Sequence, residues 1–138
     1  MSKPLIDTRL QSASAALGEI DNIQVRGKFT APWPWLVLIP LGSGCVEVFD
    51  LPETDQIKLA NLTVALARTL KSETRCDKIN IASLGNVVPQ LHVHIVARNV
   101  GDIGWPGPMF NIDAPRLSEI DAERRLIELQ RVVDCCRS

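Results

Sequence analysis

The segment QLHVHIVAR, residues 90–98, alternates polar and apolar side chains, and this pattern constrains the fold of the chain more strongly than any other. Side chains alternate across a β-strand, so Gln90, His92 and His94 are expected on one face. The apolar side chains between them would pack the opposite face against a core. Both histidines of the chain lie in this segment, so a single strand would present every imidazole of the protein.

Three other segments have the spacing of amphipathic helices. Apolar residues recur at steps of three or four in residues 8–20 and 54–71, which is typical of a helix packed by one face. Thr54 is expected to cap the second of these helices through its hydroxyl oxygen. Ser118, with an acidic residue three positions later, predicts a third helix over residues 118–134.

Short apolar segments bounded by turn-forming residues predict strands in addition to residues 90–98. They are residues 23–29, 36–40, 45–52 and 78–84. Residues 102–108 are rich in Gly and Pro, so we expect an irregular loop there. The mixture of strands and helices indicates an α+β protein.

The chain of 138 residues and 15.2 kDa fits one domain over residues 1–138, without repeats or linkers. Its net charge of −1 gives no broad cationic field for nucleic acid or a membrane surface. The start has no secretory signal pattern, and no run reaches the ~20 apolar residues of a membrane helix. The four cysteines lack CxxC spacing, so free thiols in the cytoplasm are expected. A small molecule is the expected ligand.

Two imidazoles beside an amide on one strand face allow three interpretations. In the first, they are hydrogen-bonded structural groups at the surface of the sheet. In the second, His92 and His94 bind zinc, which requires a third protein ligand that the sequence does not indicate. In the third, a neutral imidazole attacks phosphorus, because an unperturbed pKa near ~6.5 leaves it largely unprotonated at neutral pH. The pairing favours the third interpretation, with His92 at a surface-facing position.

The stretch NVVPQLHVHIVAR resembles the signature strand of the histidine triad (HIT) proteins, in which three histidines alternate with apolar residues. Gln90 occupies the first triad position, and His92 and His94 match the second and third. The resemblance extends over residues 23–107. Its flanking matches are PWLVLIP, the group Gly85, Asn86 and Val88, and Trp105, Pro106 and Gly107, which are similar to the tail of the Hint branch.

The resemblance implies an antiparallel sheet of about five strands with a central helix packed on it, N- and C-terminal helices, and a homodimer. It also implies a nucleotide hydrolase or nucleotidyl transferase that needs no metal or other cofactor. The substrate would be a nucleoside phosphoramidate or a dinucleoside polyphosphate, as for diadenosine tetraphosphate (Ap4A) hydrolases. His92 would be the nucleophile, His94 its polar neighbour, and Asn86 beside Gly85 a phosphate contact.

The chain departs from the family pattern at two positions. Gln90 can donate and accept hydrogen bonds but cannot titrate, so an acid at the first triad position is absent. Trp35 stands where many relatives carry a further histidine. It would either stack against a base or, as is more usual for an aromatic residue beside a strand, pack in the core.

Two further residues are candidates for ligand contact. Arg98 has the parity of the histidines, so it is either a phosphate contact or an exposed residue at the strand end. Trp105 in the irregular loop would close over the ligand or join a dimer contact.

The sequence therefore predicts a HIT-like nucleotide hydrolase or transferase that forms a phospho-histidine intermediate at His92. One alternative is a nucleotide-binding module that has lost catalysis with the first triad histidine. The other is a zinc site on His92 and His94.

Overall fold

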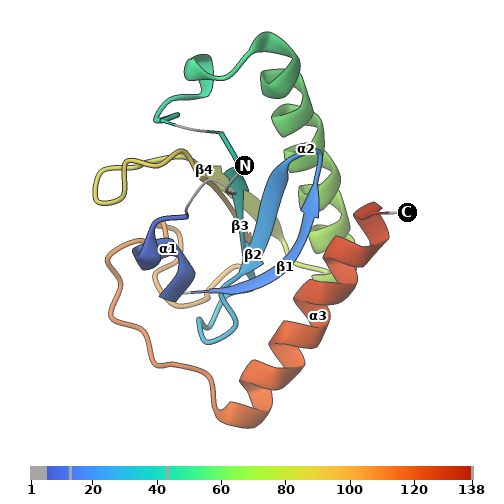
Figure 1. Cartoon of the computed structure of the whole chain (residues 1–138). Coiled ribbons are helices and arrows are strands. Elements are labelled where there is room, and N and C mark those ends of the chain that lie inside the picture. Colours follow the sequence, from blue (N-terminus) through green and yellow to red (C-terminus); the bar gives the residue numbers. More distant parts are fainter. Residues whose placement is uncertain (1–5, 13, 43, 138) are drawn as a thin grey trace.

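Five antiparallel strands form one sheet in the order β1-β2-β3-β5-β4 (Figure 1). The computed structural model describes residues 6–12, 14–42 and 44–137. The strands are β1 (Ala15–Ile20), β2 (Ile23–Gly27), β3 (Trp35–Pro40), β4 (Lys78–Ala82) and β5 (Val93–Arg98). The helices are α1 (Thr8–Ser12), the short 3-10 helix η1 (Val48–Asp50), α2 (Glu53–Thr74) and α3 (Glu119–Arg137).

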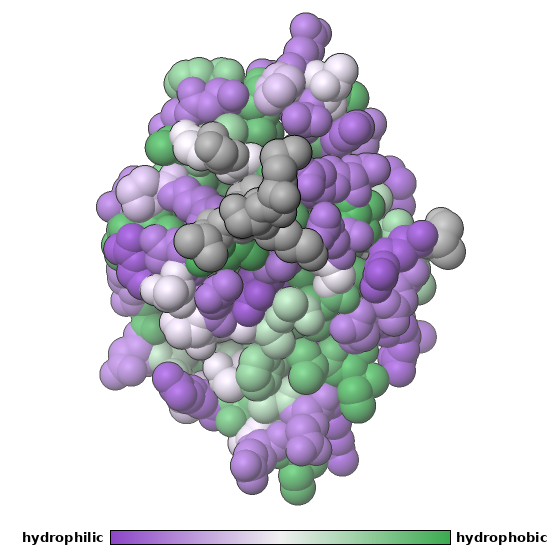
Figure 2. Space-filling model, in the orientation of Figure 1, coloured by the Kyte–Doolittle hydropathy of each residue, from purple (hydrophilic) through white to green (hydrophobic). Residues whose placement is uncertain are grey.

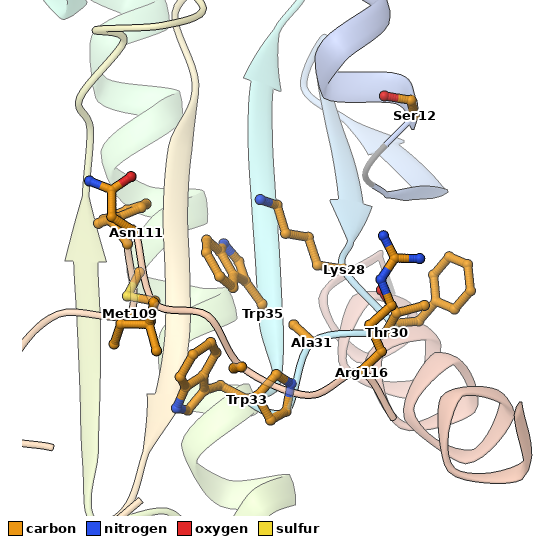
Figure 3. Close-up of a pocket in the computed structure, with 14 residues that line it drawn as sticks. Ser12, Lys28, Thr30, Ala31, Trp33, Trp35, Met109, Asn111 and Arg116 are labelled. Carbon is orange, nitrogen blue, oxygen red and sulfur yellow. The ribbon is translucent and has the colours of Figure 1, made fainter. Parts of the chain in front are cut away.

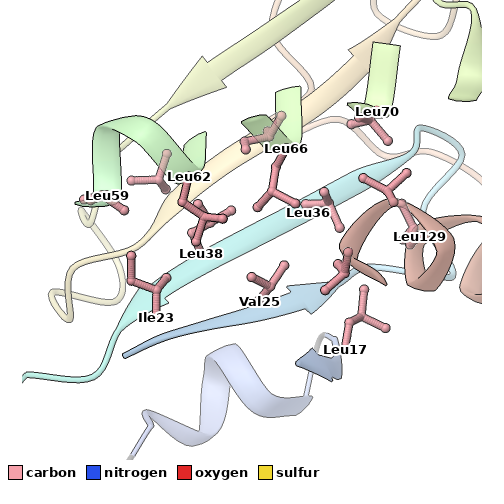
Figure 4. Close-up of a cluster of buried hydrophobic side chains, with 14 of the residues drawn as sticks. Leu17, Ile23, Val25, Leu36, Leu38, Leu59, Leu62, Leu66, Leu70 and Leu129 are labelled. Carbon is pink, nitrogen blue, oxygen red and sulfur yellow. The ribbon is translucent and has the colours of Figure 1, made fainter. Parts of the chain in front are cut away.

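The two long helices cover one face of the sheet (Figure 1). The buried residues of α2 recur at three- or four-residue steps, and those of α3 face the same layer (Figure 4). They meet strand residues of one parity in a core that includes Leu17, Val25, Leu36, Leu38, Ile95, Leu59, Leu66, Leu70 and Leu129. The apolar side chains recur every three or four residues in the helices and every second residue in the strands. Each element that contributes to this core therefore buries one apolar face.

A second, smaller core lies on the other face of the sheet. It contains Ile6, Trp33, Trp35, Val37, Ile39, Val96 and Met109. α1 and the long connection between β5 and α3 cover this face (Figure 1). Residues 92, 94, 96 and 98 have the parity of Val96, so the polar side of the predicted triad strand faces this second layer.

Most predicted elements are confirmed. The α+β sheet of five strands, the central helix and the helices near both ends are all present. Ser118 caps α3 as predicted, because its hydroxyl oxygen accepts the backbone N–H of Asp121 at 3.2 Å. Thr54 is not the cap of α2, since the helix begins at Glu53 with Pro52 at the N-cap. β5 begins at Val93, so Gln90 to His92 precede the regular strand.

The predicted helix over residues 8–20 is wrong. Only Thr8–Ser12 is helical, and Ala15–Ile20 forms β1, which pairs with β2. Leu10 packs on the second core, whereas Leu17 belongs to the core beneath α2 and α3. The two residues therefore face opposite sides of the sheet and do not share one apolar helix face. The two-residue Asp21-Asn22 connection, with positive φ at both residues, was the signal for a hairpin.

The predicted strand over residues 45–52 is also wrong. This segment contains η1, and the Asp50 carboxylate accepts the backbone N–H groups of Val46 and Glu47 at 3.1 and 2.8 Å. These local bonds use donors that a strand would give to a neighbour. Phe49 is 78% exposed, so its apolar side chain does not join a sheet face. The fifth strand of the sheet is therefore β1.

Hydrophilic residues make up most of the face seen in Figure 2, with apolar residues in smaller groups between them. Among the described residues, no helix has both the length and the apolar character needed to cross a membrane.

Candidate active site

The two histidines lie together on the sheet face opposite α2 and α3. Their ring centroids are 4.9 Å apart, with an angle of 84° between the ring planes. His92 is 6% exposed and His94 5%, so the prediction of a surface-facing His92 is wrong. The second layer of the fold covers this face, which strand alternation alone does not reveal. The neighbours of His94 are aromatic rather than aliphatic: the Trp35 and Phe110 rings lie 5.5 and 5.0 Å from its ring.

The hydrogen bond of His92 fixes its tautomer. His92 Nδ1 lies 2.6 Å from the backbone carbonyl oxygen of Gln90. A carbonyl only accepts hydrogen bonds, so Nδ1 carries the proton in this contact. In the neutral imidazole, Nε2 then keeps its lone pair and is the nucleophilic atom.

His94 has the opposite tautomer. The Trp35 indole Nε1–H donates to His94 Nδ1 at 2.9 Å, and an indole N–H can only donate. The single proton of a neutral His94 therefore sits on Nε2. Burial lowers the pKa of His94 to about 3, helped by the nearby His92 and Lys28. At neutral pH the ring is thus an uncharged donor through Nε2.

Trp35 has a role that the sequence did not predict. It is 6% exposed and belongs to the second core, with Trp33 and Phe110 at ring distances of 6.3 and 5.8 Å. Cross-strand register brings it close to His94, because Trp35 pairs with Val96 and Val37, the next residue on the same face of β3, pairs with His94. Its indole N–H orients the histidine. Of the two sequence interpretations of Trp35, core packing is the one observed, and stacking against a base stays a prediction.

Gln90 connects the triad segment to the N-terminal part of the chain. Its Oε1 accepts the backbone N–H of Asp7 at 2.8 Å. Arg9 donates to the carbonyl oxygen of Val87 at 3.0 Å and forms an ion pair with Asp7 at 2.8 Å. The hydrogen bond from Arg9 lowers the pKa of Asp7 to about 2. The amide at the first triad position thus anchors the start of α1 beside the histidines.

The loop between β4 and β5 contains Gly85 and Asn86. Gly85 has a φ of +74°, a conformation that other residues adopt rarely. Asn86 is exposed, while Val88 nearby is buried. The phosphate contact expected of Asn86 stays a prediction, since the structure contains no ligand.

Arg98 is not the exposed residue of one sequence interpretation, because its side chain is 1% exposed. Its guanidinium forms two bonds to the Asp102 carboxylate, at 2.8 and 2.6 Å, and one to the carbonyl oxygen of Gly107 at 2.8 Å. The Trp105 ring lies 5.7 Å from the guanidinium carbon, and its indole is half-buried. These contacts hold the 102–107 loop, so the strongest donors of Arg98 already have protein partners.

A cavity of about 480 Å³ opens beside this centre (Figure 3). The connection between β2 and β3 forms one wall and residues 109–116 form the other. Trp35 and Phe110 line the cavity and also contact the His94 ring, so they connect the two parts. The backbone N–H of Leu117 donates to Thr30 at 2.9 Å, which ties the two walls together.

Within the described ranges, no group of three His, Cys, Asp or Glu side chains is arranged to hold a metal ion. The zinc alternative therefore lacks a third ligand in this part of the chain. Both Nδ1 atoms also face protein partners, Gln90 and Trp35.

The sequence and the fold match known proteins. The HIT domain model matches residues 9–101. A histidine triad protein from Bradyrhizobium japonicum is 36% identical with a TM-score of 0.88, covering 96% of this chain and 99% of that chain. A histidine triad protein from Marinobacter aquaeolei is 32% identical with a TM-score of 0.89, and the match covers 97% of this chain and 98% of that chain. A histidine triad protein from Sinorhizobium meliloti is 36% identical with a TM-score of 0.85, and the match covers 92% of this chain and 95% of that chain. Comparison with curated proteins gave no match.

The five-stranded antiparallel sheet, with α2 and α3 on one face, thus has the fold of the histidine triad proteins. The chain belongs to the HIT domain family. Proteins of this family are generally nucleotide-binding hydrolases or transferases.

Proposed function

We propose that this protein is a nucleotide hydrolase or nucleotidyl transferase that uses His92 as its nucleophile. The observation that carries the proposal is the pair of opposite tautomers. The carbonyl of Gln90 leaves a lone pair on His92 Nε2, and the indole of Trp35 leaves a proton on His94 Nε2. One ring is therefore prepared to attack phosphorus and its neighbour to donate a hydrogen bond to a phosphate oxygen.

In the first step, His92 Nε2 forms a bond to the phosphorus of the nucleotide while the bond from phosphorus to the leaving group breaks. The ring becomes positively charged, and the bond from Nδ1–H to the Gln90 carbonyl stabilises that charge. His94 Nε2–H donates to a non-bridging oxygen. In the second step, water or another acceptor attacks the phosphorus and releases its proton to solvent, and the N–P bond breaks to restore neutral His92.

Among the described residues, the site has no side chain that can protonate the leaving group at neutral pH. The Gln90 amide does not titrate, and the pKa of His94 near 3 keeps that ring neutral at physiological pH. The leaving group therefore departs with the electron pair of the broken bond and takes any proton it needs from solvent. Turnover would be faster for leaving groups that are stable as anions.

A nucleotide-binding module without turnover is the second candidate. The hydrogen bond of Gln90 favours this candidate. Gln90 stands at the first triad position, where the family carries an ionisable ring, and its Oε1 accepts the backbone N–H of Asp7. In this case the same face would bind the nucleotide, with the two histidines as hydrogen-bonding groups.

We also propose that residues 1–138 form one HIT-like domain, which acts as a homodimer in the cytoplasm without a metal. Strand β4 supports the dimer, because it lies at an edge of the sheet and its Ile81 is 53% exposed. An unpaired edge strand can add to the sheet of a second copy. Asn86 is proposed to contact the phosphate.

The experiment that tests the proposed function is incubation with adenosine phosphoramidate and with diadenosine tetraphosphate, each with and without a chelator. We expect turnover that the chelator does not change, and its loss in His92→Asn, which removes the nucleophile. Circular dichroism checks that the variant folds. Binding without turnover would favour the module, and loss of activity with chelator would favour the zinc site. Full activity in a folded His92→Asn would refute the mechanism.

A further inference from the structure

The cavity beside Trp35 carries two positively charged side chains without acidic partners. Lys28 and Arg116 both line it (Figure 3). Neither belongs to an ion pair with a described residue. Among the described residues of the lining there is also no Asp or Glu. The cavity therefore has an uncompensated positive charge, which attracts anionic groups.

Lys28 places its charge close to the histidines. Its Nζ lies 4.1 Å from the centroid of the Trp35 ring, and that same indole donates to His94. Burial lowers the pKa of Lys28, and the charge of Lys28 contributes to the lowered pKa of His94. An anion beside Lys28 would provide the counter-charge that the protein does not.

The remaining walls of the cavity suit an organic ligand rather than a free ion. Trp33, Trp35, Phe29 and Phe110 supply aromatic surface, and Thr30 and Asn111 supply polar groups. The volume of about 480 Å³ falls in the usual range of sites for small molecules. A cation pair among aromatic walls fits a ligand in which a ring and a negative charge occur together.

The chemistry of the histidines points to the same class of ligand. The site has no acid for the leaving group at neutral pH, so groups that are stable as anions are favoured. A leaving group of this kind is negatively charged when it departs. The two histidine rings are neutral, so a cation elsewhere in the site is needed to stabilise that charge. Lys28 is separated from His94 by the Trp35 ring, and Arg116 lines the same cavity.

We propose, on the basis of the proposed function, that Lys28 and Arg116 recognise a second anionic group of the substrate, separate from the reacting phosphorus. The protein then selects nucleotides with a further phosphate or carboxylate over nucleotides whose remaining part is neutral. Lys28 and Arg116 are specificity residues in this arrangement and take no part in bond breaking.

Two matched pairs of ligands test this selection. Calorimetry compares binding of ADP and AMP, which differ by one phosphate. Kinetics compares the AMP phosphoramidates of β-alanine and of β-alaninamide, which differ only in the charge of a carboxylate. We expect a preference of about tenfold for the more anionic member of at least one pair, the size of one charge-assisted hydrogen bond. The pair that shows it identifies phosphate or carboxylate as the recognised group.

The variants are Lys28→Met, which keeps the aliphatic chain over Trp35, and Arg116→Gln. We expect Lys28→Met to reduce the preference to about twofold or less, and Arg116→Gln to reduce it by a smaller factor because that side chain is exposed. Lys58→Met and Arg68→Gln are the matched controls. Both positions are exposed on α2, which covers the opposite face of the sheet, and the preference should persist there.

The outcomes separate this inference from the proposed function. Turnover with no charge preference overturns the inference and leaves the function intact. A charge preference in ADP binding that is lost in Lys28→Met, without turnover of any substrate, supports the inference and refutes the enzyme. A preference that survives in Lys28→Met and Arg116→Gln, or absence of nucleotide binding, overturns the inference.

Discussion

Trp35 and His94, which are 59 positions apart in the sequence, are joined by a hydrogen bond of 2.9 Å from the indole Nε1 to the imidazole Nδ1. This bond decides which nitrogen of His94 carries the proton. It places a donor on Nε2, next to the His92 ring whose proton is fixed on the other nitrogen. Trp35 therefore orients the imidazole of His94.

Replacement of Trp35 by Phe should disturb this arrangement while it keeps an aromatic ring. Loss of the indole N–H removes a hydrogen bond worth about 1 kcal/mol, so His94 can populate both tautomers. We expect turnover to fall about fivefold, and nitrogen NMR shifts of His94 to show a mixture of tautomers. Trp33→Phe is the control, since the Trp33 N–H donates to the carbonyl of Ile103 and not to a histidine. An unchanged tautomer in Trp35→Phe would contradict the assigned role.

The lowered pKa of His94 predicts a pH dependence of stability. Burial holds this pKa near 3, whereas an unfolded histidine titrates near 6.5. As the pH falls from about 6.5 toward 3, the unfolded chain binds a proton that the folded chain does not, so stability is lost on acidification. The slope from this residue is at most about 1.4 kcal/mol per pH unit.

Urea unfolding of the wild type and His94→Asn over this pH window measures that contribution. The Asn amide oxygen can still accept the Trp35 N–H, but it does not titrate. The variant should therefore lose less stability than the wild type on acidification. Parallel curves for the two proteins would show that folding does not lower the pKa of His94.

Replacement of Gln90 by His would supply an ionisable group at the first triad position. We expect faster turnover of adenosine phosphoramidate, whose amine must be protonated, and little gain with diadenosine tetraphosphate. Gln90→Ala is the comparison, because it also removes the contact to Asp7 without adding an acid. An equal rate for Gln90→His and Gln90→Ala with the phosphoramidate would argue against a missing acid.

Arg98 is expected to be important for stability. Its side chain is 1% exposed, and removal of the guanidinium leaves the Asp102 carboxylate without its partner. Arg98→Met should lower the free energy of unfolding by about 3 kcal/mol, as measured in urea. Arg124→Met should change it by less than about 0.5 kcal/mol, since Arg124 is 78% exposed and lies 3.9 Å from Asp121. Similar losses in both variants would mean that Arg98 has no special structural role.

Elements with strong periodicity could be predicted from the sequence. The helix α2, the capped helix α3 and the two faces of the triad strand follow from spacing alone. The N-terminal segment could not, because Leu10 and Leu17 have helical spacing but pack against opposite faces of the sheet. Pairing with β2 decided that segment, and spacing contains no information on pairing with a distant strand.

The sequence by itself determined that the imidazoles of His92 and His94 lie on the same side of the sheet, because side chains alternate along an extended backbone. Only the tertiary structure decided that both rings are buried and which nitrogen of each is protonated. It also decided that Gln90 anchors Asp7, 83 positions away, and that Lys28 stands over Trp35. Burial and hydrogen bonding depend on partners that the fold brings together, and those partners set the proton positions on which the chemistry depends.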